Sequence, residues 1–453
     1  MFFDLGIIGG GPGGYVAAER AGAAGLNVVI FEKKSLGGVC LNEGCIPTKT
    51  MLYSAKLYDN ARQGGKYGVN VENATIDYRI ILKRKEKVVK KLVGAVKVAM
   101  RNNGVTVVNS EAFIEGMNGD GVIAIAAGEE RFEVRNLLIC TGSETFIPPI
   151  PGLTEAGDII CTNREILELT EPPKELVVIG GGVIGMEFAS FFNSIGTKVT
   201  VIEMLPKILG NLDNEVSAKL QTIYAKKGVT FNLGCKVVGI EGNTVVFEDP
   251  QGETQRVSGD RILVSVGRRA NVKGFGLENI GVIAERGIKV DDRMRTNIPN
   301  VYAAGDVTGF SLLAHTASRE AEVAVNNILG KDDRMSYAAI PGVVYTNPEV
   351  AGVGMTEEGA ASSGVDYAVV NLPMQFSGRF VAENELGEGI CKVIVSKADK
   401  TVLGVHMLGN PCSEIISAAC IAIEKKLTVE QLKEVVFPHP SVSEILKESF
   451  QRL

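Results

Sequence analysis

Two cysteines lie close together near the N-terminus of the chain. In the run GGVCLNEGCIPTK, Cys40 and Cys45 are five positions apart, whereas no other two of the eight cysteines are closer than eight positions. Pro47 fits the first turn of a helix, where its missing N–H costs nothing, and residues 48–61 have helix-forming composition. A helix N-terminus stabilises a thiolate, so we expect Cys45 to ionise readily, with Lys49 on the same helix face. The pattern favours a redox-active dithiol.

The spacing alone leaves other interpretations open. Residues five apart on an ideal helix have Cα atoms about 8–9 Å apart, from the helix rise and radius, whereas a disulfide spans at most about 7 Å. A bonded pair therefore requires the backbone to depart from a helix, and a strained bond is easier to reduce. Two unpaired thiols in a core are one alternative. A zinc site is another, but it needs about four ligands, and the three histidines are all distant in sequence.

Residues 3–32 have the strand, glycine turn, helix, strand and acid order of a dinucleotide-binding fold. Gly9 makes the turn, Gly11 lets the backbone approach a pyrophosphate, and Gly14 permits close packing of helix and strand. Glu32 ends the second strand, where it accepts hydrogen bonds from ribose hydroxyls. This context indicates a nucleotide site far more strongly than the glycines alone.

The same order recurs at residues 176–203, with GGGVIG as the turn and Glu203 as the acid. The acid follows the first glycine by 23 residues in both copies. Two intact copies predict two dinucleotide sites, for a flavin and a nicotinamide, rather than one site and one decayed repeat. Glu203 would repel a 2′-phosphate, and no arginine follows it in MLPK, so the sequence favours NAD over NADP.

Composition excludes several classes of protein. The 453 residues include 53 glycines, and the net charge of −6 argues against nucleic acid as a partner. No apolar run approaches the roughly 18 residues of a membrane span, and the N-terminus lacks the basic region of a signal peptide. Isolated cysteines fit a reducing compartment. We therefore expect a cytoplasmic protein without a nucleic-acid or membrane partner.

Residues 78–102 alternate apolar and basic residues at helical spacing. The basic residues are Lys83, Arg84, Lys85, Lys87, Lys90 and Lys91. A solvated helix face is the ordinary interpretation of this pattern. Docking of an acidic partner is the alternative.

Two later segments carry further candidate site residues. The strand NVYAAGD ends at Asp306, where a sheet binds ligands, and a helix from Ala314 offers its N-terminus to negative charge. We expect Asp306 to hold flavin ribityl hydroxyls. Near the C-terminus His439 lies between two prolines, with Glu444 near enough to orient its ring as a general base. A surface turn is the alternative for this histidine, whereas the other two histidines are interpreted as structural.

These motifs occur in the order found in one family. Over essentially its whole length the sequence resembles the dihydrolipoamide dehydrogenases, class I members of the flavoprotein pyridine nucleotide-disulfide oxidoreductases. The motifs are GGGPGG, GGVCLNEGCIPTK, GGGVIG, VGRR, YAAGDV, YTNPEVAGVG and HPSVSE. Val39, Phe437, Ser441 and the run PMQFSGRF depart from commoner forms.

The resemblance implies a role for each site residue. Cys40 and Cys45 form the redox disulfide; Cys40 exchanges with the dithiol substrate and Cys45 lies against the flavin. His439 is the base, with Glu444 behind it. The implied FAD contacts are Gly9, Gly11, Gly14, Glu32, Lys33, Gly38, Cys40, Lys49, Ala112, Thr141, Gly142, Asp306 and Ala314. The implied NAD contacts are Gly180, Gly182, Gly185, Glu187, Glu203, Val237 and Gly267. No metal is implied.

The resemblance also implies an α/β fold with two Rossmann-like dinucleotide-binding domains and a C-terminal α+β dimerisation domain. We expect an FAD-binding domain at 1–147, an NAD-binding domain at 148–270, a second FAD/central part at 271–335 and a dimerisation domain at 336–453. The implied enzyme is a homodimer, because the His belongs to the other subunit's C-terminal domain. Each subunit binds one non-covalent FAD and uses NAD.

The implied reaction oxidises the dihydrolipoyl group of a lipoylated carrier protein with NAD⁺, in 2-oxo acid dehydrogenase or glycine cleavage systems. Three alternatives have their own signatures. Glutathione reductases favour NADPH through arginines where Glu203 lies. Mercuric reductases carry a C-terminal redox pair, which the ending SFQRL lacks. A non-catalytic flavin-bound redox sensor would have lost one of the cysteines or His439.

Overall fold

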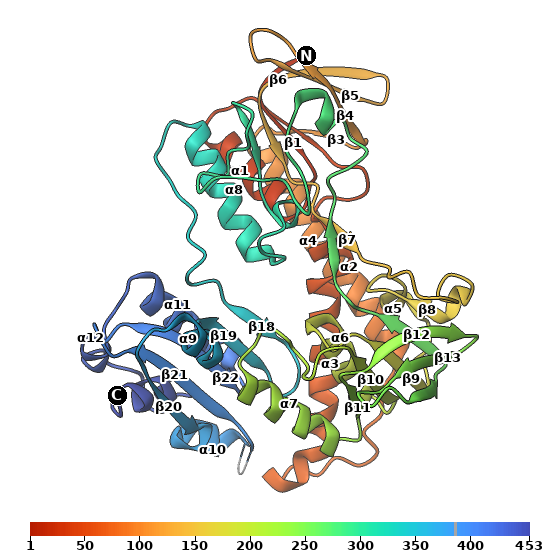
Figure 1. Ribbon diagram of the computed structural model, residues 1–453, viewed down its shortest axis with the longest axis vertical. Helices are drawn as coiled ribbons and strands as arrows, with labels where there is room; N and C mark the ends of the chain where they lie inside the picture. Colours follow the sequence, from red (N-terminus) through yellow and green to blue (C-terminus); the bar gives the residue numbers. More distant parts are fainter. Residues whose placement is uncertain (385–386) are drawn as a thin grey trace. The chain divides into compact units, whose positions relative to one another are not determined.

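The computed structural model describes residues 1–384 and 387–453, which divide into two compact units (Figure 1). The first unit comprises residues 1–50, 79–146 and 267–336. The second comprises residues 51–78, 147–266 and 337–453. Each unit has a nucleotide-binding sheet, and the second also has an antiparallel C-terminal sheet.

The sheet of the first unit has the strand order β3-β2-β1-β6-β5-β4, with β17 paired to β6. Its strands are β1 (Phe2–Ile8), β2 (Val28–Phe31), β3 (Thr106–Val108), β4 (Ala112–Met117), β5 (Ile123–Ala127), β6 (Glu130–Ile139) and β17 (Val301–Ala303). The pairs β1–β2, β1–β6, β2–β3 and β6–β17 are parallel. Because parallel strands are covered on both faces, β2 is a continuous apolar run, and β1 is mainly apolar apart from Asp4.

Helices cover this sheet. The helices of the first unit include α1 (Pro12–Ala23), α2 (Gly38–Glu43) and α8 (Ala314–Ile328), with the start of α3 (Cys45–Gln63) and nearly all of α4 (Tyr78–Asn102). α1 and α8 lie side by side (Figure 1). The buried residues of α1 are all glycine or alanine, which lets its backbone approach its neighbours closely. A short ribbon of β7 (Ser143–Thr145) and β16 (Arg268–Ala270) completes this unit.

The nucleotide-binding part of the second unit has the strand order β11-β10-β9-β15-β8. Its elements are β8 (Ile160–Cys161), α5 (Glu165–Glu168), β9 (Glu175–Ile179), α6 (Val183–Ser194), β10 (Lys198–Glu203), α7 (Asn214–Lys226), β11 (Thr230–Leu233) and β15 (Arg261–Val264). A three-stranded meander follows β11: β12 (Lys236–Glu241), β13 (Thr244–Glu248) and β14 (Thr254–Ser258). All sheet pairs of β9 and β10 are parallel, as in the first unit.

The C-terminal sheet is antiparallel, in the order β18-β19-β22-β21-β20. Its strands are β18 (Gly342–Val344), β19 (Val350–Gly354), β20 (Tyr367–Pro373), β21 (Ile390–Ser396) and β22 (Val402–Leu408). The helices are α9 (Glu357–Ser363), α10 (Gly378–Asn384), α11 (Cys412–Glu424), α12 (Val429–Lys433) and α13 (Glu444–Phe450). One core joins this sheet to α11 and α13, with Phe380, Ile416 and Phe450 at most 2% exposed.

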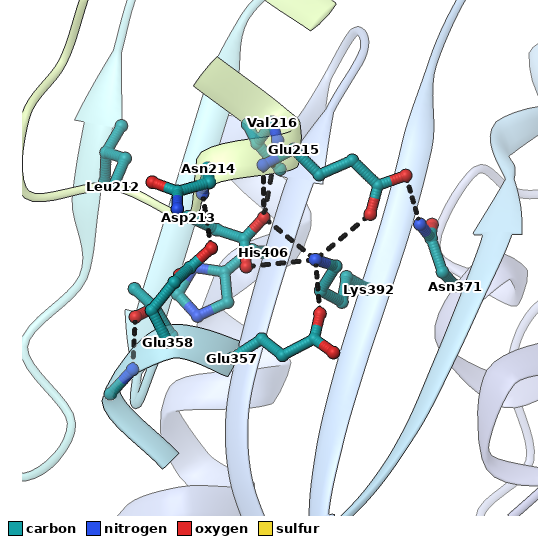
Figure 2. A network of polar contacts seen from close by, with 12 residues as sticks. Leu212, Asp213, Asn214, Glu215, Val216, Glu357, Glu358, Asn371, Lys392 and His406 are labelled. Atoms are coloured by element: carbon teal, nitrogen blue, oxygen red, sulfur yellow. Dashed lines mark hydrogen bonds and ion pairs between the residues drawn. The ribbon is translucent and has the colours of Figure 1, made fainter. Parts of the chain in front are cut away.

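A buried ion-pair cluster lies within the second unit (Figure 2). Lys392 on β21 has a side chain only 3% exposed. Its Nζ atom lies 3.1 Å from both carboxylate oxygens of Asp213 and 2.8 Å from Oε2 of Glu357. Glu215 contributes a third carboxylate at 3.0 Å. Asp213 also accepts the N–H groups of Glu215 and Val216 as the N-cap of α7, so the cluster joins α7 to β21 and α9.

Most predicted elements are present with small shifts at their ends. The helix predicted at 78–102 has those bounds as α4. The strand predicted to run from 300 to 306 is shorter, because β17 ends at Ala303 and Asp306 begins a 3₁₀ turn. The antiparallel pair β4–β5 and the meander β12–β14 have no counterpart among the predicted elements. The four-domain division stays a prediction.

Candidate active site

Cys40 and Cys45 lie on two consecutive helices. Cys40 is inside α2, and Cys45 is the first residue of α3. Gly44 separates them with φ −144° and ψ −106°, so the backbone leaves the helix between the two cysteines. This is the departure that a bond between them requires. Residues 38–43 form a short helix of their own, which follows the left-handed Gly37, at φ 97°.

The two thiols are hydrogen-bonded to each other. The hydrogen bond with Cys45, together with burial and the charge of a Cys45 thiolate, raises the pKa of Cys40 far above its ordinary value. Lys49 opposes this shift with a smaller effect. Cys40 is therefore the member of the pair that binds its proton more tightly than an ordinary thiol does.

The first glycine loop packs in the way its motif predicts. Gly9 has φ 104°, and a Cβ atom there would lie 2.2 Å from the carbonyl oxygen of Cys140. A Cβ on Gly14 would lie 1.8 Å from the carbonyl oxygen of Gly9. A Cβ on Gly11, in contrast, would meet only Gly38, at 3.8 Å. The open side at Gly11 adjoins the N-terminus of α1, which is a suitable place for a pyrophosphate.

The carboxylate of Glu32 binds the backbone both in the glycine loop and just after β2. Its Oε2 atom accepts the N–H of Gly10 at 2.8 Å, and its Oε1 atom accepts the N–H of Lys34 at 2.7 Å. Each oxygen still has a lone pair for a ribose hydroxyl. Lys33 donates to Glu111 at 2.8 Å. Glu111 directly precedes Ala112, so this contact places Ala112 at the same end of the sheet as Lys33. The structure thus gathers Glu32, Lys33 and Ala112 where an adenosine half would bind.

Asp306 is half-buried and has two polar partners. Ser143 donates to its Oδ2 atom at 2.5 Å. Arg268 donates from Nε to Oγ of Ser143 at 2.7 Å and from Nη2 to the carbonyl of Ser143 at 2.7 Å. Burial raises the pKa of Asp306, and the hydrogen bond from Ser143 and the charge of Arg268 partly offset this effect. The carboxylate is therefore fixed in one orientation.

A buried glutamate supports the loop before Asp306. Glu320 on α8 is fully buried, and its Oε2 atom accepts the N–H of Gly305 at 2.6 Å. Burial above all, and then the charge of Glu320, raise the pKa of the nearby Cys140 thiol. Sequence reasoning missed Ser143, Arg268 and Glu320. Arg268 belongs to the VGRR motif and Ser143 follows the predicted contacts Thr141 and Gly142, but nothing in the sequence marks Glu320.

Three further predicted flavin contacts are Thr141, Gly142 and Ala314. Thr141 donates from Oγ1 to the carbonyl of Asn271 at 2.7 Å, and the carbonyl of Gly142 accepts the N–H of Asn271 at 2.9 Å. Ala314 is the first residue of α8. The first unit contains the first glycine loop, Asp306, the N-termini of α1 and α8, and the two cysteines. The donor set fits FAD: a glycine cradle for its phosphates and carboxylates for its hydroxyls.

The second glycine loop repeats the first. A Cβ on Gly180 would lie 2.5 Å from the carbonyl oxygen of Ser265, and one on Gly185 would lie 2.1 Å from that of Gly180. A Cβ on Gly182 would meet nothing within 4 Å. Glu203 accepts the N–H of Gly181 at 2.6 Å and that of Leu205 at 2.8 Å. These residues fit a second dinucleotide.

Glu187 lies buried on α6, one turn inside this loop. Its Oε1 atom accepts the backbone N–H of Tyr345 at 3.1 Å. Val237 is on β12, two residues after Cys235, whose N–H donates to the carbonyl of Glu203 at 3.0 Å. Gly267, the remaining predicted NAD contact, belongs to the first unit, whereas the others belong to the second.

His439 and Glu444 form a dyad in the second unit. The Nδ1 atom of His439 lies 2.9 Å from Oε1 of Glu444, and Oε2 of Glu444 accepts the N–H of Ser441 at 2.9 Å. The N–H of Ser441 and then His439 lower the pKa of Glu444. An ionised Glu444 accepts a hydrogen bond from Nδ1–H, which leaves Nε2 of the neutral ring as a base. The imidazole is 80% exposed, so a substrate can reach it.

The other two histidines are not part of this geometry. His406 is buried, with Nε2 2.8 Å from the carbonyl of Met355, and His315 is the second residue of α8. Among the residues that the structure describes, no group of three or more His, Cys, Asp or Glu side chains could hold a metal ion. No helix in the described ranges has the length and apolar character needed to cross a membrane.

Residues 3–321 match the family model described as pyridine nucleotide-disulphide oxidoreductase, and residues 340–450 match the dimerisation domain of that family. The chain belongs to the pyridine nucleotide-disulphide oxidoreductases. It therefore carries a dimerisation domain at its C-terminal end, as predicted.

The relatives extend over nearly the full chain. The dihydrolipoyl dehydrogenase of Geobacillus stearothermophilus is 38% identical over 451 residues, which cover 98% of this chain and 94% of the relative. That of Chlamydia muridarum is 36% identical over 452 residues, covering 99% and 96%. The solved structure of LpdA from Mycobacterium tuberculosis superposes with a TM-score of 0.90 at 25% identity, covering 99% of both chains.

These findings confirm the predicted family and the predicted α/β fold with a dimerisation domain. They also confirm the predicted enzyme class, an oxidoreductase related to dihydrolipoyl dehydrogenases, and the expected FAD and NAD as the cofactors of this family. The roles of individual residues stay predictions.

Proposed function

We propose that this chain is a dihydrolipoamide dehydrogenase, which oxidises the dihydrolipoyl group of a lipoylated carrier protein with NAD⁺. The observation that carries the proposal is the hydrogen-bonded Cys40–Cys45 pair across the break at Gly44. Two sulfurs this close can form and break the disulfide that a dithiol substrate exchanges with. We place the enzyme in the cytoplasm, where its other, mostly buried cysteines stay reduced.

The dithiol chemistry needs a base and two sulfurs. Nε2 of His439, held by Glu444, removes a proton from one thiol of the dihydrolipoyl group. The resulting thiolate attacks Sγ of Cys40 in the oxidised pair and releases Cys45 as a thiolate. The second substrate thiol, once deprotonated, attacks the mixed disulfide and frees Cys40. Two electrons and the two substrate hydrogens thus leave the substrate as it becomes lipoyl disulfide.

The cofactor residues bind and orient the electron carriers. Gly9, Gly11, Gly14, Glu32 and Asp306 would hold FAD, which when bound supplies a two-electron path from the dithiol to NAD⁺. Gly180, Gly182, Gly185 and Glu203 would hold NAD, with Glu187 near its nicotinamide. The carboxylate of Glu203 lies where the 2′-phosphate of NADP would require a cation, which supports NAD as the substrate.

The active form is a homodimer with the site at the subunit interface. The dimerisation domain supports this assembly. In this arrangement His439 and Glu444 serve the dithiol of the other subunit, so each site contains residues of both chains.

The proposal is tested by steady-state turnover of free dihydrolipoamide with NAD⁺ and with NADP⁺. We expect robust NADH formation by the wild type and a loss of at least about 10³-fold in Cys45→Ser and Cys40→Ser, because neither variant can close a disulfide. Both variants should retain FAD, measured by absorbance after gel filtration. Full turnover in either variant, or a preference for glutathione disulfide with NADPH, would refute the proposal.

A further inference from the structure

Helix α4 carries a continuous basic stripe on its exposed face. We define the stripe as Arg79, Lys83, Lys87, Lys90, Lys97 and Arg101, all of which are exposed. A helix turns about 100° per residue, so these six side chains emanate from an arc of about 80° along a length of about 33 Å. The buried residues Ile81, Val93 and Met100 project outside this arc. The stripe is therefore an ordered row of charge rather than a scatter of surface lysines.

The charge of the stripe is not neutralised within the chain. None of its six cations forms an ion pair with any residue in the described ranges. Glu86 is the only acidic residue of α4, whereas the whole protein has a net charge of −6. Six unpaired cations on an acidic protein create a local positive potential that attracts an acidic surface.

Exposed aliphatic side chains border the stripe near its two ends. Ile80 is 62% exposed and Val98 is 43% exposed. At about 100° per residue the two fall on the same line, beside Lys87. These two side chains would supply apolar contacts beside the charged row.

The stripe adjoins the redox-active helix. Nη1 of Arg84, on α4, donates to the carbonyl oxygen of Thr50 at 2.8 Å. Thr50 lies on α3 five residues after Cys45, about 7.5 Å along the helix axis. This hydrogen bond fixes the N-terminal half of α4, which also carries Arg79, Lys83 and Lys87, to the helix that carries Cys45.

We propose that this stripe docks the acidic face of the lipoylated carrier protein, an inference that rests on the proposed function. The substrate dithiol is then the tip of an arm on a macromolecule, whose encounter with the enzyme is steered by charge. A protein partner is favoured over nucleic acid because the protein's overall negative charge opposes a polyanion. It is favoured over a membrane because the cations form one narrow row with two apolar residues, not a broad apolar face.

The test compares two double charge reversals in the full-length holoenzyme. Lys90→Glu/Lys97→Glu alters the stripe, and Lys273→Glu/Lys331→Glu is the matched control, with the same charge change on exposed, unpaired lysines of the same unit. Lys and Glu have similar helix propensity, so α4 should fold in both. Turnover is measured with free dihydrolipoamide and with a purified, reduced, lipoylated carrier domain of net negative charge, at several salt concentrations.

For the carrier domain, we expect the stripe variant to lose about tenfold in kcat/KM at low salt and to lose most of the salt dependence of kcat/KM. The stripe variant should turn over free dihydrolipoamide at the wild-type rate. The control variant should turn over both substrates at the wild-type rate. An equal loss in both variants, or no loss in the stripe variant, would overturn the docking proposal alone. The docking proposal also fails if sedimentation shows that the stripe variant is monomeric. It fails likewise if the only property that the stripe variant loses is binding to phosphatidylserine vesicles. A wild type inactive with free dihydrolipoamide would overturn the proposed function itself.

Discussion

Glu32 and Glu203 make the same pair of hydrogen bonds in the two nucleotide-binding folds. Each accepts the N–H of the second glycine of its loop through Oε2 and the N–H two residues beyond itself through Oε1. Each carboxylate therefore locks its own glycine turn and keeps lone pairs that we propose bind a ribose hydroxyl. This equivalence makes matched substitutions at the two positions informative.

Replacing Glu203 with Gln should raise the KM for NAD⁺ about tenfold or more, because the amide nitrogen would oppose one backbone N–H and a charged hydrogen bond contributes about 1.5–3 kcal/mol. The retention of FAD should not change. The measurement is steady-state kinetics in NAD⁺ at saturating dihydrolipoamide.

The reciprocal variant is Glu32→Gln. It should weaken FAD binding, so that flavin dissociates faster on dilution, as followed by flavin fluorescence. The variant enzyme reconstituted with FAD should keep its KM for NAD⁺. If both substitutions affected both cofactors alike, the assignment of one cofactor to each fold would be wrong.

The His439–Glu444 dyad predicts a defect confined to the dithiol half of the reaction. Glu444→Gln should lower kcat with dihydrolipoamide about 10²-fold, because the amide no longer fixes the Nδ1–H tautomer that leaves Nε2 as the base. Oxidation of NADH by ferricyanide, which bypasses the dithiol, is the control and should stay within about twofold of wild type. A comparable loss in both assays would remove the dyad from its proposed role.

The Cys40–Cys45 hydrogen bond predicts how the reactivity of Cys40 depends on pH. Cys45→Ala removes both the hydrogen bond and the negative charge that raise the pKa of Cys40. The pH at which Cys40 is alkylated by iodoacetamide should therefore fall in the reduced variant relative to the reduced wild type. Peptide mapping by mass spectrometry follows the modification, with half-buried Cys420 as the internal reference. An unchanged pH profile would contradict the hydrogen bond.

The buried pair of Lys392 and Asp213 predicts a large loss of stability on removal of one member. Lys392→Met should lower the free energy of unfolding by about 3–5 kcal/mol, because Asp213 is left as an uncompensated buried charge. Adding Asp213→Asn should restore part of that loss. Chemical denaturation of the wild-type holoenzyme, the two single variants and the double variant measures these free energies. If the loss in the double variant equals the sum of the two single losses, the pairing is excluded.

The same pair gives a pH dependence of stability with a defined sign. Burial opposes ionisation of Asp213, but the hydrogen bonds and charge of Lys392 outweigh it, so the pKa of Asp213 lies below its ordinary value. Its contribution is complete above the unfolded-state pKa, about 3.9, and is lost as the pH falls through the lower folded-state pKa. Thermal unfolding between about pH 3 and pH 7 should show a smaller acid-induced drop in Asp213→Asn than in wild type.

The sequence by itself determined the chemistry of the sites and the nature of the local elements. Glycines at fixed spacing, followed by Glu32 and by Glu203, specify two nucleotide-binding turns, because only glycine tolerates the backbone approach at Gly9 and Gly180. The cysteine spacing required a break between Cys40 and Cys45, and Gly44 provides it. These are short-range relations, which a linear pattern can contain.

Only the tertiary structure decided which distant residues support them. Arg268 and Ser143 reach Asp306 because β7 pairs with β16. Glu320 lies beneath the Asp306 loop because α8 packs there, and Lys392 meets Asp213 from 179 positions away. Such partners follow from how strands and helices are assembled. That assembly depends on the packing of the whole chain, and no local run of residues encodes it.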